Sequence, residues 1–170
     1  MSKRQLEQFL KELKRKELES QVLDLYQRFK SVKEFYDFSF NPNEVKRFEL
    51  SKSKIGKEYF PEGKRKPKKR VSVAQKEITQ LINLEADPER IADLMLFNLE
   101  IAQTFCAETP VKSDAFYRSM LKSFRHALVY IENQFLQESF KHRIARIVEE
   151  ANRQNWFNSD GFSLAVKSLF

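Results

Sequence analysis

Apolar side chains recur every three or four residues along almost the whole chain, which is the spacing of α-helices and not of strands. The strongest instance is residues 88–107. Most of its circumference is apolar, and its acidic residues, among them Asp93 and Glu100, share one narrow sector. A helix that is apolar on most sides must pack against neighbours on most sides. We therefore expect residues 88–107 to lie at the centre of a helical fold.

The shortage of turn-forming residues points in the same direction. Three Gly and five Pro among 170 residues are too few for the many tight turns of an all-β protein. Sixteen Phe provide the large apolar surface that a helical core needs. The sequence thus predicts an all-α single domain of about seven or eight helices. Two packings stay open, an irregular bundle and a small α-solenoid-like stacking of helical hairpins.

Capping residues mark where several of these helices begin. Asp87 followed by Pro88 is typical of a helix start, with an N-cap side chain and proline at the first helical position. Ser113 or Asp114 begins the next helix, and Ser72 has the spacing of a capping box with the Gln three residues later. Apolar stripes at helical spacing run through residues 6–13, 18–36, 45–55, 73–82, 91–106, 116–135 and 140–151, and a short helix follows near the C-terminus.

Positive charge is concentrated in one short segment, PEGKRKPKKR at residues 61–70. The segment carries a net charge of +5, whereas residues 1–60 carry +4 and residues 71–170 carry −2. Its two Pro and one Gly interrupt the helical pattern. We therefore divide the domain into an N-terminal helical unit (1–60), a basic loop (61–71) and a C-terminal helical core (72–170).

The basic loop has three interpretations: a solvated connection, a segment that binds a polyanion, and a segment that docks a protein. If its Lys and Arg neutralised phosphates, binding would weaken steeply with salt. The loop lacks aromatic residues on which bases could stack. A second basic stripe is expected on the helix that begins near residue 114. The polyanion-binding candidates are Lys64, Arg65, Lys66, Lys68, Lys69 and Arg70 in the loop and Arg118, Lys122 and Arg125 in the stripe.

Aromatic residues support a different hypothesis, a protein–protein interaction adaptor. Phe97 lies in the polar sector of the central helix, and Trp156 and Phe157 follow the last long helix. If exposed, these three are candidates for docking a protein. Asn98, by contrast, lies in the apolar sector. We expect that a neighbouring segment covers Phe97 and that Asn98 caps a backbone group. The alternatives are that Phe97 is exposed and docks a protein, or that Asn98 belongs to a small polar site.

Signatures of catalysis or metal binding are missing from the sequence. His126 and His142 lack the spacing of a metal site and are expected at the surface. Cys106 lies on an apolar helix face, where a thiol acts as a small hydrophobic group. Asp93 and Glu100 are expected to face solvent. We predict no catalytic, cofactor-binding or metal-ligating residues and no cofactor; enzymatic activity stays an open question.

Cysteine content and hydropathy bear on location. A single cysteine allows no internal disulfide, which suits a reducing cytoplasm. No apolar run approaches the roughly 18 residues that a membrane span needs. The amphipathic, basic start contains Glu7 and Glu12, and mitochondrial presequences are poor in acidic residues. We therefore expect a cytoplasmic location and no membrane contact.

A resemblance to a known family is carried by four segments, KEYFPEGKRKPKKRVSVAQK, ADLMLFNLEIAQTF, FYRSMLKSF and QNWFNSDGF. Over essentially its whole length the chain resembles a small bacterial family known only as a domain of unknown function. The resemblance implies a stand-alone cytoplasmic bacterial protein. It implies no activity and no site residues.

The leading hypothesis is a non-catalytic helical binding protein with an accessible basic loop. Its partner is unknown, and nucleic acid or another polyanion is the first candidate. The alternative is the interaction adaptor that uses exposed aromatic residues. Neither the oligomeric state nor the packing of the N-terminal unit follows from the sequence.

Overall fold

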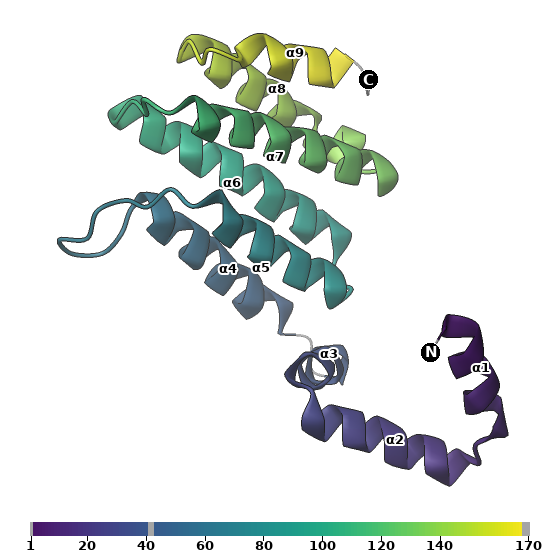
Figure 1. Cartoon of the computed structure of the whole chain (residues 1–170). Helices are drawn as coiled ribbons and strands as arrows, with labels where there is room; N and C mark the ends of the chain where they lie inside the picture. The colour runs from purple at the N-terminus through teal and green to yellow at the C-terminus, as the bar shows by residue number, and fades with distance from the viewer. Residues whose placement is uncertain (1, 41–42, 168–170) are drawn as a thin grey trace. The chain divides into compact units, whose positions relative to one another are not determined.

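The computed structural model describes residues 2–40 and 43–167, and these residues form nine helices and no strand. The all-α prediction is confirmed, although the number of helices is nine instead of seven or eight. None of the described helices is long and apolar enough to cross a membrane. The helices are α1 (Lys3–Glu12), α2 (Arg15–Arg28), α3 (Lys30–Phe40), α4 (Glu44–Tyr59), α5 (Val71–Asn83), α6 (Pro88–Glu108), α7 (Asp114–Asn133), α8 (Gln137–Arg153) and α9 (Ser159–Lys167) (Figure 1).

The chain divides into two compact units, a first unit (Met1–Asn43) and a second unit (Glu44–Phe170). The sequence placed this division at the basic loop instead. The difference arises because α4 packs against both α5 and α6 and so belongs with the helices that follow it. The basic loop therefore connects two helices of one unit.

The first unit contains one more helix than the sequence predicted. The expected single helix over residues 18–36 is broken at Phe29, whose backbone is extended between α2 and α3. The two helices pack against each other, and the Tyr26 hydroxyl donates a hydrogen bond of 2.7 Å to the Asp37 carboxylate. No residue of α1, α2 or α3 is buried.

The second unit is a stack of helices that alternate in direction from α4 to α9 (Figure 1). Its central member is α6, which packs against α4, α5, α7 and α8, while α9 packs against α7 and α8. Leu94, Leu96 and Leu99 of α6 have no exposed surface. The predicted central position of this helix is confirmed, and the packing matches the predicted stacking of helical hairpins.

Helix starts in the second unit follow local capping signals in two of three predicted cases. The Asp87 carboxylate accepts a hydrogen bond from the backbone of Glu89, and the Ser113 hydroxyl accepts one from Phe116, as expected at the starts of α6 and α7. The capping box predicted at Ser72 is wrong. Instead, α5 begins at Val71, two residues before the predicted start, with Arg70 as an N-cap that makes no side-chain capping bond.

Three turns between the helices share one geometry. Glu85, Phe135 and Asn155 follow α5, α7 and α8 with positive φ angles of 53°, 57° and 51°. After each, the next residue donates to a carbonyl in the last helical turn: Ala86 to Leu81, Leu136 to Ile131 and Trp156 to Ala151, at 3.1, 2.9 and 3.0 Å. These are Schellman motifs, which usually carry glycine at the left-handed position. None of the three does so here.

Candidate polyanion-binding loop

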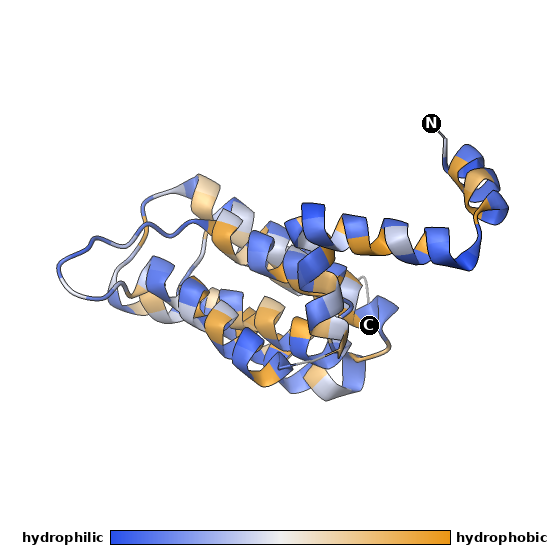
Figure 2. Cartoon of the chain, turned by 90° about the horizontal axis from the view of Figure 1, so that it is seen from below, coloured by the Kyte–Doolittle hydropathy of each residue, from blue (hydrophilic) through white to orange (hydrophobic). Residues whose placement is uncertain are grey.

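The basic loop projects beyond the ends of α4 and α5, and Figure 2 shows it mostly in the hydrophilic colour. Two of its residues have left-handed backbone, Gly63 with φ 68° and Lys69 with φ 53°. Glycine adopts this conformation without strain, whereas lysine does so at a cost. The conformation at Lys69 must therefore be held by its surroundings.

Glu58, in the last turn of α4, holds the returning end of the loop. Its backbone carbonyl accepts hydrogen bonds from the N–H groups of Lys68 and Lys69 at 3.0 and 2.9 Å. Its carboxylate accepts from the Arg70 guanidinium at 2.9 and 2.7 Å and from the Arg70 backbone at 3.2 Å. The hydrogen bond from the Arg70 guanidinium is the main cause that lowers the pKa of Glu58. Arg70 is therefore engaged within the protein.

Lys69 is also engaged, through a contact with the core. Its ammonium lies 5.5 Å from the centre of the Phe105 ring of α6, within the range of a cation–π interaction. The same group lies 3.5 Å from the Pro67 carbonyl oxygen. Two of the six predicted cations of the loop thus anchor it.

The other four cations of the loop are Lys64, Arg65, Lys66 and Lys68. All four are exposed, and within residues 2–40 and 43–167 their side chains make no hydrogen bond or ion pair. The acidic residue of the loop, Glu62, forms an ion pair of 2.9 Å with Lys57 of α4. The loop therefore presents four positive charges that no carboxylate contacts.

The predicted basic stripe, Arg118, Lys122 and Arg125, lies exposed along α7. Arg118 forms an ion pair of 3.6 Å with Asp114, and its guanidinium lies 5.8 Å from the centre of the Phe157 ring. Among the described residues no hydrogen bond, ion pair or ring contact joins the stripe to the basic loop. The structure thus brings Arg118 to the docking candidate Phe157 and does not join the stripe to the loop.

The docking candidates differ in exposure. Phe157 is 58% exposed, as the docking hypothesis requires. Trp156 is only 4% exposed, so the prediction of an exposed Trp156 is wrong. It follows the Schellman turn of α8, so its ring turns inward against Tyr117 and Phe162, and its Nε1 donates to Gln154 at 2.9 Å.

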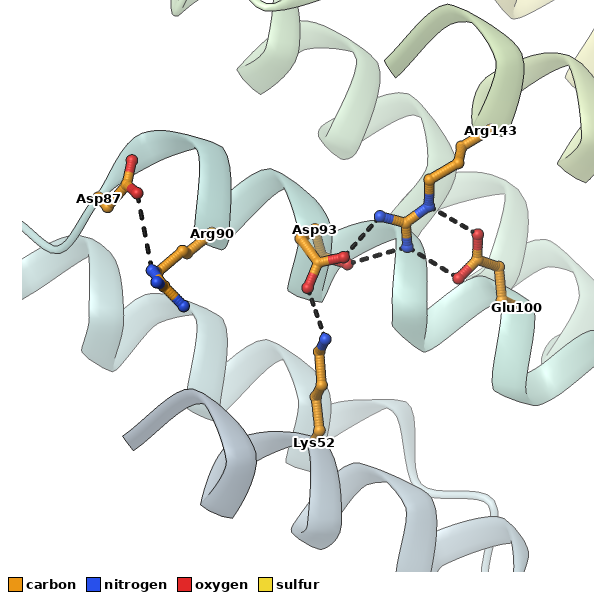
Figure 3. Close-up of polar contacts among 6 residues, drawn as sticks. All are labelled: Lys52, Asp87, Arg90, Asp93, Glu100 and Arg143. Carbon is orange, nitrogen blue, oxygen red and sulfur yellow. Dashed lines mark hydrogen bonds and ion pairs between the residues drawn. The ribbon is translucent and has the colours of Figure 1, made fainter. Parts of the chain in front are cut away.

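Ion pairs join Asp93 and Glu100 of α6 to Lys52 of α4 and Arg143 of α8 (Figure 3). The Lys52 ammonium of α4 lies 5.6 Å from the centre of the Phe97 ring and 2.7 Å from the Asp93 carboxylate. Arg143 of α8 contacts Asp93 at 2.5 Å and Glu100 at 2.8 and 2.9 Å. The expected cover over Phe97 is confirmed. The expectation that Asp93 and Glu100 simply face solvent is wrong.

Burial alone would raise the pKa of Asp93, but the hydrogen bonds from Lys52 and Arg143 outweigh it and lower this pKa. The guanidinium of Arg143 has a raised pKa, because its bonds to Glu100 and Asp93 outweigh the opposing effect of burial. Every charged group in this cluster has a partner of opposite sign. The cluster therefore joins α4, α6 and α8 and offers no free charge to a ligand.

A second polar cluster joins α4 to α5. Glu77 of α5 is buried, and its carboxylate accepts hydrogen bonds from the Ser51 hydroxyl at 2.9 Å and the Lys54 ammonium at 2.8 Å. Neither this cluster nor the role of Glu58 has a local sequence signal, because the partners of both carboxylates lie more than ten residues away. Together they fix the hairpin that carries the basic loop.

The remaining candidates do not assemble into a reactive site. Asn98 is buried, and its Oδ1 has no hydrogen-bond partner among the described residues, so a capping bond by this oxygen is not found. Cys106 is buried, and burial raises the pKa of its thiol to about 11. His126 and His142 are exposed, as predicted. Within the described ranges no three His, Cys, Asp or Glu side chains are placed to hold a metal.

A shallow cleft of about 330 Å³ lies between α6 and α8. Its lining includes Glu100, Gln103, Arg146 and Glu150, and neither histidine nor Asn98 takes part. Gln103 donates to the Ile147 carbonyl at 2.7 Å and Arg153 pairs with Glu150 at 2.6 Å, so these lining groups already have partners.

Comparison with known proteins gives one match. The sequence model of a family of unknown function (DUF6155) matches residues 1–169. No curated protein and no solved structure matches the chain.

Proposed function

The chain belongs to this family of unknown function. From its own residues we propose that it is a non-catalytic binding protein whose basic loop binds the phosphate backbone of a nucleic acid. The observation that carries the proposal is the set of four exposed cations, Lys64, Arg65, Lys66 and Lys68, that no carboxylate contacts. Each can neutralise a phosphate and release a condensed counterion, which is the main source of sequence-independent affinity for nucleic acids.

The anchoring of the loop supports binding further. Glu58 fixes the returning end through the backbone of Lys68 and Lys69 and through Arg70, and Lys69 rests on Phe105. An anchored loop loses less conformational freedom on binding than a free one, so more of the electrostatic gain is retained. Its cations are thereby presented from one defined place on the second unit.

The chemistry of the loop favours contact with phosphates over contact with bases. Residues 61–71 contain no aromatic side chain, and stacking on aromatic rings is how proteins hold unpaired bases. The neighbouring Phe60 ring packs edge-on against Phe105, at 5.8 Å between ring centres. We therefore expect little preference for sequence and similar use of duplex and single strand.

The salt dependence of affinity tests the number of contacts. Four phosphate contacts predict a log–log slope of about −3.6 for duplex DNA and about −2.8 for a single strand. Between about 50 and 200 mM salt the duplex affinity should then fall roughly 150-fold. Six contacts would give about −5.4, so a slope near that value would contradict the assignment of Lys69 and Arg70 as anchors. Fluorescence anisotropy with short labelled DNA and RNA measures these slopes.

Two variants that remove equal charge locate the site. The loop variant replaces Lys64, Arg65, Lys66 and Lys68 with Ser, and the control variant replaces four exposed lysines outside the loop and the stripe, Lys11, Lys16, Lys112 and Lys167, with Ser. The loop variant should lose nearly all affinity and flatten the salt slope, while the control keeps both. Equal loss in the two variants would mean that overall charge, not the loop, attracts nucleic acid, and the proposal would fail.

A second candidate function, protein docking, is favoured by one observation. Phe157 keeps 58% of its surface exposed and lies at the centre of a group with Tyr117 and Arg118. We expect Phe157→Ser to lower the binding affinity for any specific protein partner. Phe135→Ser is the matched control, because Phe135 is 89% exposed and belongs to no such group. Equal weakening by both would argue against docking at Phe157.

We also propose a cytoplasmic location in a bacterial cell. A lone buried cysteine is consistent with a reducing compartment. Fractionation of cells that express the tagged full chain would test the location, and recovery from the envelope fraction would contradict it.

A further inference from the structure

No apolar side chain is fully buried in the described part of the first unit, residues 2–40. Residues 2–40 contain fifteen, of which seven are exposed and eight are half-buried. The exposed ones are Leu6, Phe9, Val22, Leu23, Leu25, Phe29 and Phe40, and the half-buried ones are Leu10, Leu13, Leu18, Tyr26, Val32, Phe35, Tyr36 and Phe38. Exposed apolar side chains that gather into patches mark sites of interaction with other molecules. The apolar surface of the first unit indicates an interface.

Two of the three helices of the first unit are too short to be stable without a partner. α1 has 10 residues and α3 has 11, below the roughly 12–15 residues at which isolated helices become marginally stable in water. Support within the helices of the first unit is local: a capping box at Ser2 and ion pairs within helices, such as Lys3 with Glu7 and Arg15 with Glu19. Burial of the apolar helix faces must therefore supply the remaining stability of these helices.

An apolar groove of about 390 Å³ runs along the α2–α3 hairpin. Five of its six lining side chains are Val22, Leu23, Tyr26, Tyr36 and Phe40. The sixth, Asp37, accepts the hydrogen bond of the Tyr26 hydroxyl, so its charge is partly satisfied. The groove has the character of a site for an apolar helix face.

α1 carries the matching ridge. Leu6, Phe9, Leu10 and Leu13 follow the i, i+3, i+4, i+7 spacing with which an amphipathic helix fills a groove. Leu13 and Lys14 join α1 to α2 through extended backbone, with ψ angles of 139° and 155°. Figure 1 shows α1 leaving the end of α2 at a steep angle instead of lying along the α2–α3 hairpin. The ridge and the groove of one copy thus stay apart.

We propose that a second copy of the chain brings them together. In this homodimer the α1 ridge of each copy lies in the α2–α3 groove of the other. The arrangement is isologous: the same contact occurs twice about a two-fold axis, as in most soluble homodimers.

Two quantities favour a second copy as the occupant. If each of the nine apolar side chains of the ridge and the groove loses on the order of 50 Å² on association, each copy buries roughly 450 Å², the size of a weak interface that dissociates on dilution. Residues 2–40 carry nine Lys and Arg against seven Asp and Glu. This near balance imposes little like-charge repulsion between two identical surfaces.

Sedimentation velocity of the full chain over a dilution series tests the proposal. The wild type should be a dimer at high concentration and a monomer on dilution. Phe9→Asp, in the ridge, and Leu23→Asp, in the groove, should each raise the dimer Kd by about 30-fold or more. Val129→Asp is the control, because Val129 is an exposed apolar residue on α7 and should leave the Kd unchanged.

Two further measurements show whether each variant stays folded and whether the ridge of one copy contacts the groove of the other. Fluorescence of Trp156, which is buried in the second unit, shows whether each variant stays folded there. In a Cys106→Ser background, chains with Phe9→Cys and chains with Leu23→Cys are mixed and oxidised. The reciprocal dimer predicts disulfides mainly between the two kinds of chain. A wild type that is monomeric at every concentration, or crosslinks that form only between identical chains, would overturn the proposal.

Discussion

In the first unit α1, α2 and α3 bury none of their apolar side chains, whereas in the second unit α4 alone buries Phe48, Ile55 and Tyr59. Both units have helices with apolar stripes, and α1 has the most one-sided stripe of the nine described. What differs is the number of neighbours. α6 has a helix on each of several sides, and α2 and α3 have mainly each other. A clear stripe therefore indicates that a helix needs a partner and does not ensure that the chain supplies one.

Charged residues differ between the units in the same way. In the first unit the ion pairs join residues one helical turn apart, as Arg28 does with Asp24. In the second unit Arg143 and Lys52 reach Asp93 from two other helices. Pairs within one helix reinforce that helix alone, whereas pairs between helices also fix their packing. The second unit should therefore be the more stable and cooperative of the two.

The largest expected effect is the loss of a core side chain. Leu99 is fully buried in α6, so Leu99→Ala should lower the free energy of unfolding of the second unit by about 3–5 kcal/mol. Leu23→Ala, at a residue 60% exposed, should leave that unit unchanged. Urea unfolding followed by Trp156 fluorescence measures both. Equal losses would mean that the two units unfold together, and the comparison would fail.

Removal of an ion pair between helices should have the next largest effect. Arg143→Ala leaves Asp93 and Glu100 without their shared partner, so the free energy of unfolding should fall. We expect a loss of about 1–2 kcal/mol and not more, because the ion pairs of Arg143 are still partly exposed to solvent. The matched control is Arg28→Ala, whose pair is largely solvated and whose effect should be within experimental error. A control as damaging as Arg143→Ala would show that the two kinds of pair are equivalent.

The pH dependence of stability provides a third test. The pKa of Asp93 is lower in the folded protein than in the unfolded chain, so its contribution is fully present above about pH 4. That contribution is lost as pH falls through the folded pKa, when the carboxylate takes up a proton. The urea midpoint for unfolding of the second unit should fall as the pH falls through this acid range. The midpoint of the Asp93→Asn variant should fall less. An identical decline in the variant would contradict the role assigned to Asp93.

The smallest effect concerns the left-handed turns. Phe135 is 89% exposed with φ 57°, so Phe135→Gly removes backbone strain and little contact, and it should stabilise the second unit by about 0.5–1 kcal/mol. Asn155→Gly should gain less, because Asn tolerates this conformation. Thermal melts compare the two variants. A destabilised Phe135→Gly would show that the exposed ring makes a contact that matters.

Local signals explain which helices the sequence predicted well. Asp87 with Pro88 and Ser113 start α6 and α7 because a cap acts within a few residues and needs nothing else from the fold. Phe29 ends α2 without a Gly or Pro, so the break between α2 and α3 has no such signal. The start of α5 was misplaced because Glu58, twelve residues earlier, binds the N-cap residue itself.

The candidate loop was predictable in position and only partly in chemistry. Its six cations and its lack of helix follow from composition, but the division into two anchors and four free cations depends on Glu58 and Phe105. Similarly, Trp156 and Phe157 are adjacent in sequence, and the turn at Asn155 decides which ring enters the core. Contacts made across the fold fix these details, and no local pattern contains them.

Chemical labelling of the single cysteine can measure local opening of the second unit. The Cys106 thiol is buried and its pKa is raised to about 11, so an alkylating reagent should react with it only when α6 is transiently uncovered. The labelling rate, divided by that of the unfolded chain, then equals the fraction of molecules open at any moment. No added probe is needed. The population of transiently open molecules can therefore be measured in the native chain under ordinary buffer conditions.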